Sequence, residues 1–184
     1  DPALQRQALR PDADGRRKLI LATSIAETSL TIEGVRIVID SGLSRRPRFD
    51  KAAGLSRLVT ERSSQASATQ RAGRAARQGA GTAYRLWEAA ATAGMMPFDP
   101  PEIAESDLMP LVLDAAAWGV TNLASLSWLD APAEAAVAEA RGRLCAMGAL
   151  DADGRITEAG RAIASLPLPV PLAHMMLEAA AAGE

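Results

Sequence analysis

The first half of the chain alternates short apolar runs with polar turns, the pattern of an α/β unit. Strands buried on both faces appear as continuous apolar runs, and such runs occur at residues 18–22, 35–40 and 82–87. Residues 43–49 and 55–60 are two more extended runs around a turn-rich segment, and they predict a β-hairpin. Helices are predicted at residues 3–10 and 64–77, the second capped by Ser64 or Ser67.

The second half carries its apolar residues at helical spacing instead. Helices are predicted at residues 107–118, 133–147, 157–165 and 172–182. Leu150 and Ile156 flank a tight turn and predict a tiny two-stranded wing. The order helix, helix, wing, helix is typical of a winged-helix module.

Proline-rich residues 95–101 suggest a boundary between the halves. We expect three parts: an α/β domain at residues 1–98, a winged helix at 99–167, and the start of a helical domain at 168–184.

Composition narrows the class of protein. The chain has 184 residues, 48% hydrophobic and 23% charged, as in ordinary soluble domains. Its single cysteine, Cys145, excludes an internal disulfide, and no cluster of His, Cys and Asp has metal-ligand spacing, so no bound metal is predicted. No apolar run is long enough to span a bilayer and no signal-peptide core is visible, so we expect no membrane partner and a cytoplasmic location.

The net charge of −2 hides a division between the halves. Residues 1–88 carry 16 Lys and Arg against 9 Asp and Glu, a balance of +7. Residues 89–184 carry 4 against 13, a balance of −9. The asymmetry indicates that the first half binds a polyanion.

The octet at residues 70–77, Gln-Arg-Ala-Gly-Arg-Ala-Ala-Arg, is the most informative stretch. Its three arginines, Arg71, Arg74 and Arg77, recur every third residue and so lie near one side of a helix. Gly73 removes bulk between them. Two interpretations fit the octet alone: guanidinium groups that grip phosphate oxygens, or a solvated basic helix face.

Two other segments also allow two interpretations. Residues 23–32 place several hydroxyls after the first predicted strand, where α/β sheets bind ligands, but local capping explains them equally well. The predicted hairpin carries Arg45, Arg46, Arg48, Lys51 and Arg57. These cations can follow a nucleic-acid backbone, or they can simply protect an exposed strand edge.

Together, residues 22–32, 39–67 and 70–77 resemble the second RecA-like lobe of DEAH-box RNA helicases, most closely the bacterial HrpB type. Residues 22–32 are similar to the family's fifth helicase motif and residues 70–77 to its sixth, with the hairpin region between them. The resemblance implies an α/β, partial RecA-like parallel sheet with a protruding β-hairpin. An α+β winged helix and the start of a helical bundle would follow.

The resemblance also implies roles for single residues. Arg74 and Arg77 match the arginine fingers that reach nucleotide phosphates across the lobe interface, and Gln70 matches the residue that orients the attacking water. The expected cofactor is ATP or another NTP, with Mg²⁺ held mainly by a first lobe that these residues do not contain. The other residues expected at the nucleotide are Ser29, Thr31, Glu33 and Arg71.

RNA is the expected partner, as single strands or structured RNA. The residues expected on its backbone are Thr23 and Ser24 in the fifth motif, and Arg46 and Arg48 in the hairpin. Three positions depart from the family: Ser24 replaces Asn, Ala76 replaces the second glycine of the sixth motif, and Leu9 replaces an aromatic that stacks on adenine.

The sequence lacks the Gly-x-x-x-x-Gly-Lys-Ser/Thr loop and the Asp-Glu-Ala-His motif that hold phosphates and Mg²⁺. The resemblance therefore implies that this chain supplies half of the active site of an NTP-driven RNA helicase or RNA–protein remodeller. By itself the chain is expected to be inactive. The alternative is a non-enzymatic nucleic-acid-binding module with the winged helix as reader. The helix at residues 133–147 argues against that reader, because its charges nearly balance and it has few base-reading side chains.

Overall fold

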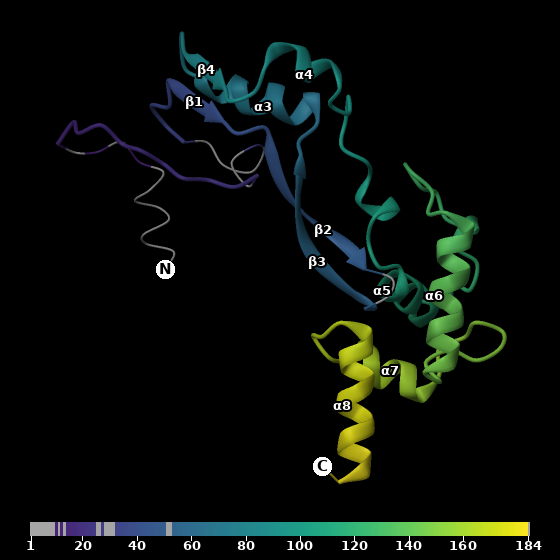
Figure 1. Ribbon diagram of the computed structural model, residues 1–184. Coiled ribbons are helices and arrows are strands. Elements are labelled where there is room, and N and C mark those ends of the chain that lie inside the picture. The colour runs from purple at the N-terminus through teal and green to yellow at the C-terminus, as the bar shows by residue number, and fades with distance from the viewer. Residues whose placement is uncertain are drawn as a thin grey trace. The chain divides into compact units, whose positions relative to one another are not determined.

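The computed structural model describes residues 10, 12, 14–24, 27, 32–50 and 53–183 (Figure 1). The chain divides into two compact units: the first comprises residues 1–46 and 58–99, the second residues 47–57 and 100–184. The helix predicted at residues 3–10 lies outside the described residues, apart from Arg10. The separate helical part expected from residue 168 stays a prediction.

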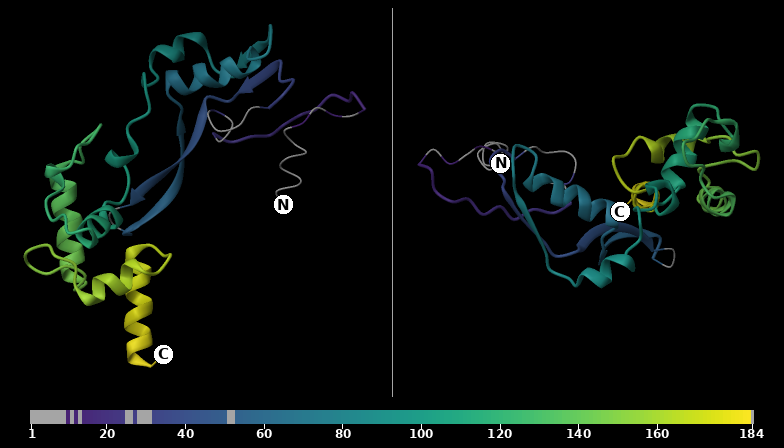
Figure 2. Two further views of the ribbon diagram at one scale, coloured as in Figure 1. Left: turned by 180° about the vertical axis from the view of Figure 1, so that it is seen from behind. Right: turned by 90° about the horizontal axis from the view of Figure 1, so that it is seen from above.

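The first unit is built on a parallel pair of strands. β1 (Ile37–Asp40) pairs with β4 (Thr82–Arg85), in a register that runs from Ile37 opposite Thr82 to Asp40 opposite Arg85. Helix α3 (Gln65–Ala75) packs on one face of this pair (Figure 2). A parallel pair crossed by a helix is the predicted α/β arrangement. A short helix that the sequence did not predict, α4 (Ala89–Ala93), follows β4.

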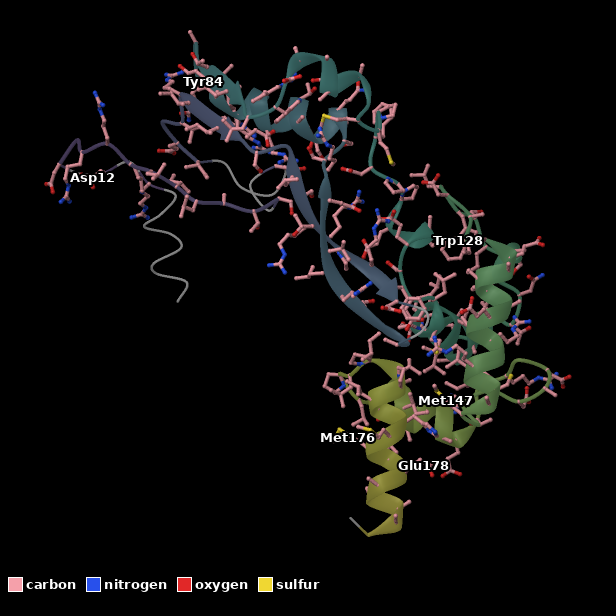
Figure 3. All side chains as sticks on the ribbon, in the orientation of Figure 1. Asp12, Tyr84, Trp128, Met147, Met176 and Glu178 are labelled. Atoms are coloured by element: carbon pink, nitrogen blue, oxygen red, sulfur yellow. The ribbon has the colours of Figure 1, made fainter. Side chains whose placement is uncertain are left out.

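The opposite face of the β1–β4 pair carries large exposed side chains. Ile37, Ile39 and Tyr84 are all more than half exposed, and Tyr84 is labelled in Figure 3. The strand predicted at residues 18–22 is wrong in this structure: these residues form no strand, and Leu19 and Leu21 are 83% and 91% exposed. An apolar run becomes a strand only where a neighbour supplies hydrogen bonds and cover, which the described residues do not give it.

The predicted hairpin is confirmed as β2 (Leu43–Asp50) and β3 (Leu55–Arg62), which form a two-stranded sheet. Its tip, residues 47–57, belongs to the second unit. There Phe49 donates its backbone N–H to the Glu105 carbonyl oxygen over 3.3 Å, Arg48 pairs with the Glu105 carboxylate, and the Arg143 guanidinium lies 5.6 Å from the Phe49 ring centroid. An ion pair, a backbone bond and a cation–π contact therefore hold the tip.

The second unit has the predicted winged-helix order. Its elements are η1 (Glu102–Ala104), α5 (Met109–Ala117), η2 (Leu123–Ser125), α6 (Glu134–Ala146), α7 (Glu158–Ala164) and α8 (Val170–Ala182). The wing is reduced to one antiparallel bridge between Leu150 and Ile156. Met109, Leu113, Leu144 and Ile163 are almost fully buried and form the centre of the core.

Helix α8 begins two residues before its predicted start. Pro171 lies in its first turn, where a missing N–H costs no helical hydrogen bond. Within the described residues, no helix combines the length and the apolar character needed to cross a membrane.

Burial affects the carboxyl of Asp107, which precedes α5 in the second unit. Burial raises the pKa of its carboxyl, which outweighs the hydrogen bond from the Met109 N–H (3.0 Å) and the nearby Arg143 charge. Since the pKa is raised in the folded state, the ionised carboxylate opposes folding. This cost is absent below the ordinary value of 3.8 and develops as the pH rises through the raised pKa.

Candidate functional site

Helix α3 carries the arginine octet as far as Ala75, and its first turn is firmly anchored. The Ser64 hydroxyl accepts a hydrogen bond from the Ser67 N–H over 3.0 Å, which confirms Ser64 as the N-cap. The Gln65 side chain donates to the carbonyl oxygens of Thr92 and Met95, over 3.1 and 3.0 Å. These contacts fix the start of α3, and regular helix geometry then sets the direction of the side chains further along it.

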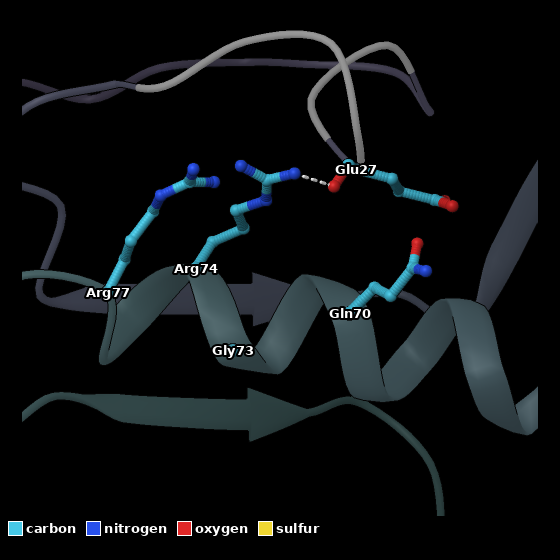
Figure 4. A pocket seen from close by; sticks show the side chains of 5 residues that line it. All are labelled: Glu27, Gln70, Gly73, Arg74 and Arg77. Carbon is cyan, nitrogen blue, oxygen red and sulfur yellow. Dashed lines mark hydrogen bonds between the residues drawn. The ribbon is translucent and has the colours of Figure 1, made fainter.

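One face of α3 borders an open cavity of about 450 Å³. Gln70, Gly73, Arg74 and Arg77, here called the arginine face, line it together with Glu27 (Figure 4). Residues spaced by three, four and seven lie on one side of a helix, so sequence spacing alone brings these four together. Because Gly73 has no side chain, the middle of this face is open.

Two guanidinium groups project from the arginine face on the side where Glu27 lies. The Arg74 guanidinium donates a hydrogen bond to the Glu27 carbonyl oxygen, and Arg77, just beyond the end of α3, points to the same side (Figure 4). Arg77 forms no ion pair with a described residue. The face therefore presents two fixed positive charges and one amide to a ligand that enters the cavity.

Arg71 does not line the cavity. Its Nε lies 3.0 Å from Glu27 Oε1 and its Nη1 lies 2.9 Å from Asp40 Oδ1, in an ion-paired group that is largely buried. Nη1 also donates to the Leu43 carbonyl oxygen over 3.0 Å. The structure thus separates Arg71 from the three octet residues with which the sequence grouped it.

The two hairpin arginines expected on RNA both have acidic partners. Arg46 Nη1 lies 2.8 Å from Asp99 Oδ1, and its Nε lies 3.8 Å from Glu61 Oε1. Arg48 pairs with Glu105. An RNA phosphate that bound either guanidinium would compete with these carboxylates.

The remaining predicted residues are only partly visible. Thr23 and Ser24 are exposed, and the Ser24 carbonyl oxygen accepts the Glu27 N–H over 2.9 Å in a turn. Glu33 is exposed in a turn before β1. Ser29, Thr31 and Leu9 lie outside the described residues, as does most of the hydroxyl-rich segment.

Sequence reasoning missed the acidic side of the site. Residues of α3 pair with three acidic side chains: Arg71 with the largely buried Glu27 and Asp40, and the Ser67 hydroxyl with Glu27 and the more exposed Asp99. A weak signal was available, since Glu27 is the only acid within the hydroxyl-rich residues 23–32 and Asp40 ends a strand at the base of the hairpin. Neither position reveals its partner, because the pairs join residues more than 30 apart in the chain.

Comparisons with known proteins give a consistent result. Residues 2–79 match the helicase conserved C-terminal domain, and residues 140–168 match the helicase associated domain (HA2), winged-helix. The chain is 43% identical over 175 residues to the ATP-dependent RNA helicase HrpB of Escherichia coli (strain K12), covering 95% of this chain and 22% of that protein. It is 38% identical over 183 residues to the probable ATP-dependent RNA helicase DHR2 of Saccharomyces cerevisiae, covering 99% of this chain and 25% of that protein.

A crystal structure of the Escherichia coli DEAH/RHA helicase HrpB has a similar fold, with a TM-score of 0.85 and 43% sequence identity. The similarity covers 94% of this chain and 22% of that one. The chain thus spans about a quarter or less of the length of the curated relatives it matches. The second RecA-like lobe and winged helix expected from the sequence are confirmed as the fold class, and the chain belongs to the DEAH/RHA helicases, carrying their conserved C-terminal domain and associated winged helix.

Proposed function

We propose that this chain supplies the second-lobe half of the nucleotide-hydrolysing site in an NTP-driven RNA helicase. The observation that carries the proposal is the arginine face, where Gln70, Arg74 and Arg77 border one open cavity. Phosphoryl transfer is catalysed mainly by positioning and by positive charge at the phosphates. Two guanidinium forks and an amide, on α3 and the turn that follows it, fit a triphosphate better than they fit an uncharged ligand.

The residues of the arginine face divide the work by their chemistry. Arg74 and Arg77 bind phosphate oxygens and stabilise the negative charge that develops during transfer. Gln70 has both a donor and an acceptor, so it can orient a water for attack. The bound NTP and its Mg²⁺ supply the reacting phosphoryl group and further charge neutralisation. The phosphate-binding loop and the main Mg²⁺ ligands would come from the first lobe of the full-length protein.

Three further residues complete the proposed nucleotide contacts: Ser29 at the γ-phosphate, and Thr31 and Glu33 near the ribose. Thr23 and Ser24 would contact the RNA backbone through hydroxyl and peptide groups, and the exposure of both side chains supports this role. Contacts of this kind bind the backbone without reading the sequence.

The full-length protein provides the test of this function. We expect single-stranded RNA to stimulate its NTP hydrolysis, and we expect RNA binding to be insensitive to sequence and weakened by salt. Hydrolysis assays with and without RNA, and binding titrations on single-stranded RNA and duplex DNA at two salt concentrations, measure both. Sequence-selective duplex binding without hydrolysis would contradict the proposal and favour the non-enzymatic reader.

Gly73→Ala tests whether a bound nucleotide comes close to the arginine face. A Cβ at Gly73 meets nothing within 4 Å among the described residues, so the variant should fold normally and gain up to about 1 kcal/mol of helix stability. Turnover should nevertheless fall roughly ten- to a hundredfold, because the methyl group occupies space next to the reacting phosphates.

Gly142→Ala is the matched control for Gly73→Ala, since it places the same methyl group on an open position of helix α6. RNA-stimulated hydrolysis of this control should equal that of the unmodified protein. Full turnover in Gly73→Ala would show that no ligand comes close to the middle of the arginine face.

A further inference from the structure

A buried group of charges lies behind the arginine face, within the first unit. The side chains of Arg71, Glu27 and Asp40 are only 17%, 11% and 3% exposed, and Arg71 lies between the two carboxylates. Nη1 of Arg71 contacts both Asp40 and the Leu43 carbonyl oxygen. Removing one member of a desolvated group leaves an unpaired charge, so the geometry of the three side chains is tightly linked.

The hydroxyl of Ser67 holds the Glu27 carboxylate from a second side. Ser67 Oγ lies 3.0 Å from Glu27 Oε2 and 2.7 Å from Asp99 Oδ2. A hydroxyl carries one proton, so it donates to one of these carboxylates at a time. Because Ser67 and Arg71 are four residues apart on α3, one stripe of the helix fixes the Glu27 side chain.

The main chain of Glu27 contacts Arg74, which lies about one turn beyond Arg71 on α3. The Glu27 carbonyl oxygen accepts the hydrogen bond from the Arg74 guanidinium (Figure 4). Glu27 is therefore held by its side chain at Ser67 and Arg71, and it in turn contacts the charged end of Arg74. A shift of Glu27 would move an acceptor that restricts the rotamers of Arg74.

We propose that Arg71 and Glu27 form a positioning pair that orients the finger Arg74, and that Arg71 is not a nucleotide ligand. This inference rests on the proposed function of Arg74. Arg71 already has three partners in the chain: a carboxylate on each of two segments and the Leu43 carbonyl oxygen. Its remaining Nη2 is buried, with no acceptor among the described residues, so it offers no accessible donor to a ligand in the cavity.

A double-mutant cycle with Glu27→Gln and Arg71→Lys tests the pair in the full-length protein. The glutamine keeps the shape of Glu27 without its charge, and the lysine keeps a charge for Asp40 but loses the fork that also reaches Glu27. Each single variant should lower kcat for RNA-stimulated hydrolysis roughly tenfold and change the KM for NTP by less than about twofold. The double variant should be no slower than the slower single one, since both remove the same interaction.

A direct nucleotide contact by Arg71 predicts a different pattern. Arg71→Lys would then raise the KM for NTP, Glu27→Gln would leave both constants unchanged, and the effects would add; any of these results overturns the positioning pair. Ser67→Ala removes the hydroxyl that Glu27 and Asp99 share, without changing a charge, so it keeps the test informative if Arg71→Lys does not fold. It should lower kcat with KM unchanged, and an unaltered kcat would count against the pair.

Two reference variants separate this inference from the proposed function. Arg77→Ala lies outside the pair, so an unimpaired Arg77→Ala would reject the proposed function itself. If Arg77→Ala loses turnover while Glu27→Gln keeps it, only the positioning pair fails. Arg155→Lys is the matched control: this arginine pairs with Asp153 on the wing, where both side chains are 70% exposed, and neither kinetic constant should change.

Discussion

Arg74→Ala in the full-length protein is expected to lower RNA-stimulated NTP hydrolysis by roughly 10³- to 10⁵-fold, the range of an arginine finger. The guanidinium lies at the edge of the cavity on a helix whose first turn is capped and anchored, so its charge is positioned before any ligand binds. Equilibrium binding of NTP should change little, because most contacts to the ground state would come from the first lobe. Steady-state hydrolysis and titration with a fluorescent nucleotide measure the two effects separately.

Arg74→Lys shows whether charge alone suffices. A lysine keeps one positive charge but lacks the planar fork, so we expect it to recover only a small part of the lost rate. Arg155→Ala, which removes an exposed arginine from the wing, is the control and should hydrolyse NTP normally. Turnover of Arg74→Ala close to that of the unmodified protein would reject Arg74 as a finger.

Local sequence signals predicted much of the fold. The cap at Ser64 and the two glycines after residue 78 predicted helix α3 to within two residues at its C-terminus, because both ends depend on adjacent residues. The hairpin and the helices of the second unit followed from periodicity in the same way. The strand expected at residues 18–22 is the exception. An apolar run indicates that burial is favourable, but it does not indicate which neighbouring segment provides that burial.

The separation of Arg71 from the arginine face follows from helix geometry that a regular repeat conceals. Positions three apart turn by 300° in an α-helix, so Arg71 lies about 60° around the axis from Arg74, and it lies about 100° from Gln70. Gln70 and Arg74 differ by only about 40°. Three identical residues in the sequence therefore serve two surfaces, one toward the cavity and one toward the buried carboxylates.

The acidic partners could not be predicted from spacing. Arg46 pairs with Asp99, 53 residues away, and Arg71 pairs with Asp40, 31 residues away. The sequence showed excess positive charge in residues 1–88, which suggested that the hairpin arginines are available to RNA. In the fold, carboxylates from distant segments neutralise several of these cations, so the charge available to a polyanion is smaller than the count implies.

Gly160→Ala is expected to destabilise the second unit by about 3 kcal/mol or more. An added Cβ would lie 2.1 Å from the Ala149 carbonyl oxygen and 2.9 Å from Ile156 Cγ1. The backbone cannot retreat easily, because the Thr157 N–H donates to that same carbonyl oxygen over 3.0 Å and the Gly160 N–H donates to the Thr157 hydroxyl over 3.0 Å. Denaturant unfolding followed by tryptophan fluorescence should show the loss, since Trp128 packs against the core of this unit.

Gly142→Ala makes the same chemical change where the structure predicts the opposite sign. Gly142 is inside α6, and a Cβ there meets nothing within 4 Å among the described residues. Alanine reduces the entropy of the unfolded chain without a clash, so this variant should gain about 0.5 to 1 kcal/mol. Equal unfolding midpoints for Gly160→Ala and Gly142→Ala would mean that α7 does not approach residue 149 as closely as the structure places it. Because α7 packs on both α5 and α8, the close approach at Gly160 sets how these three helices meet.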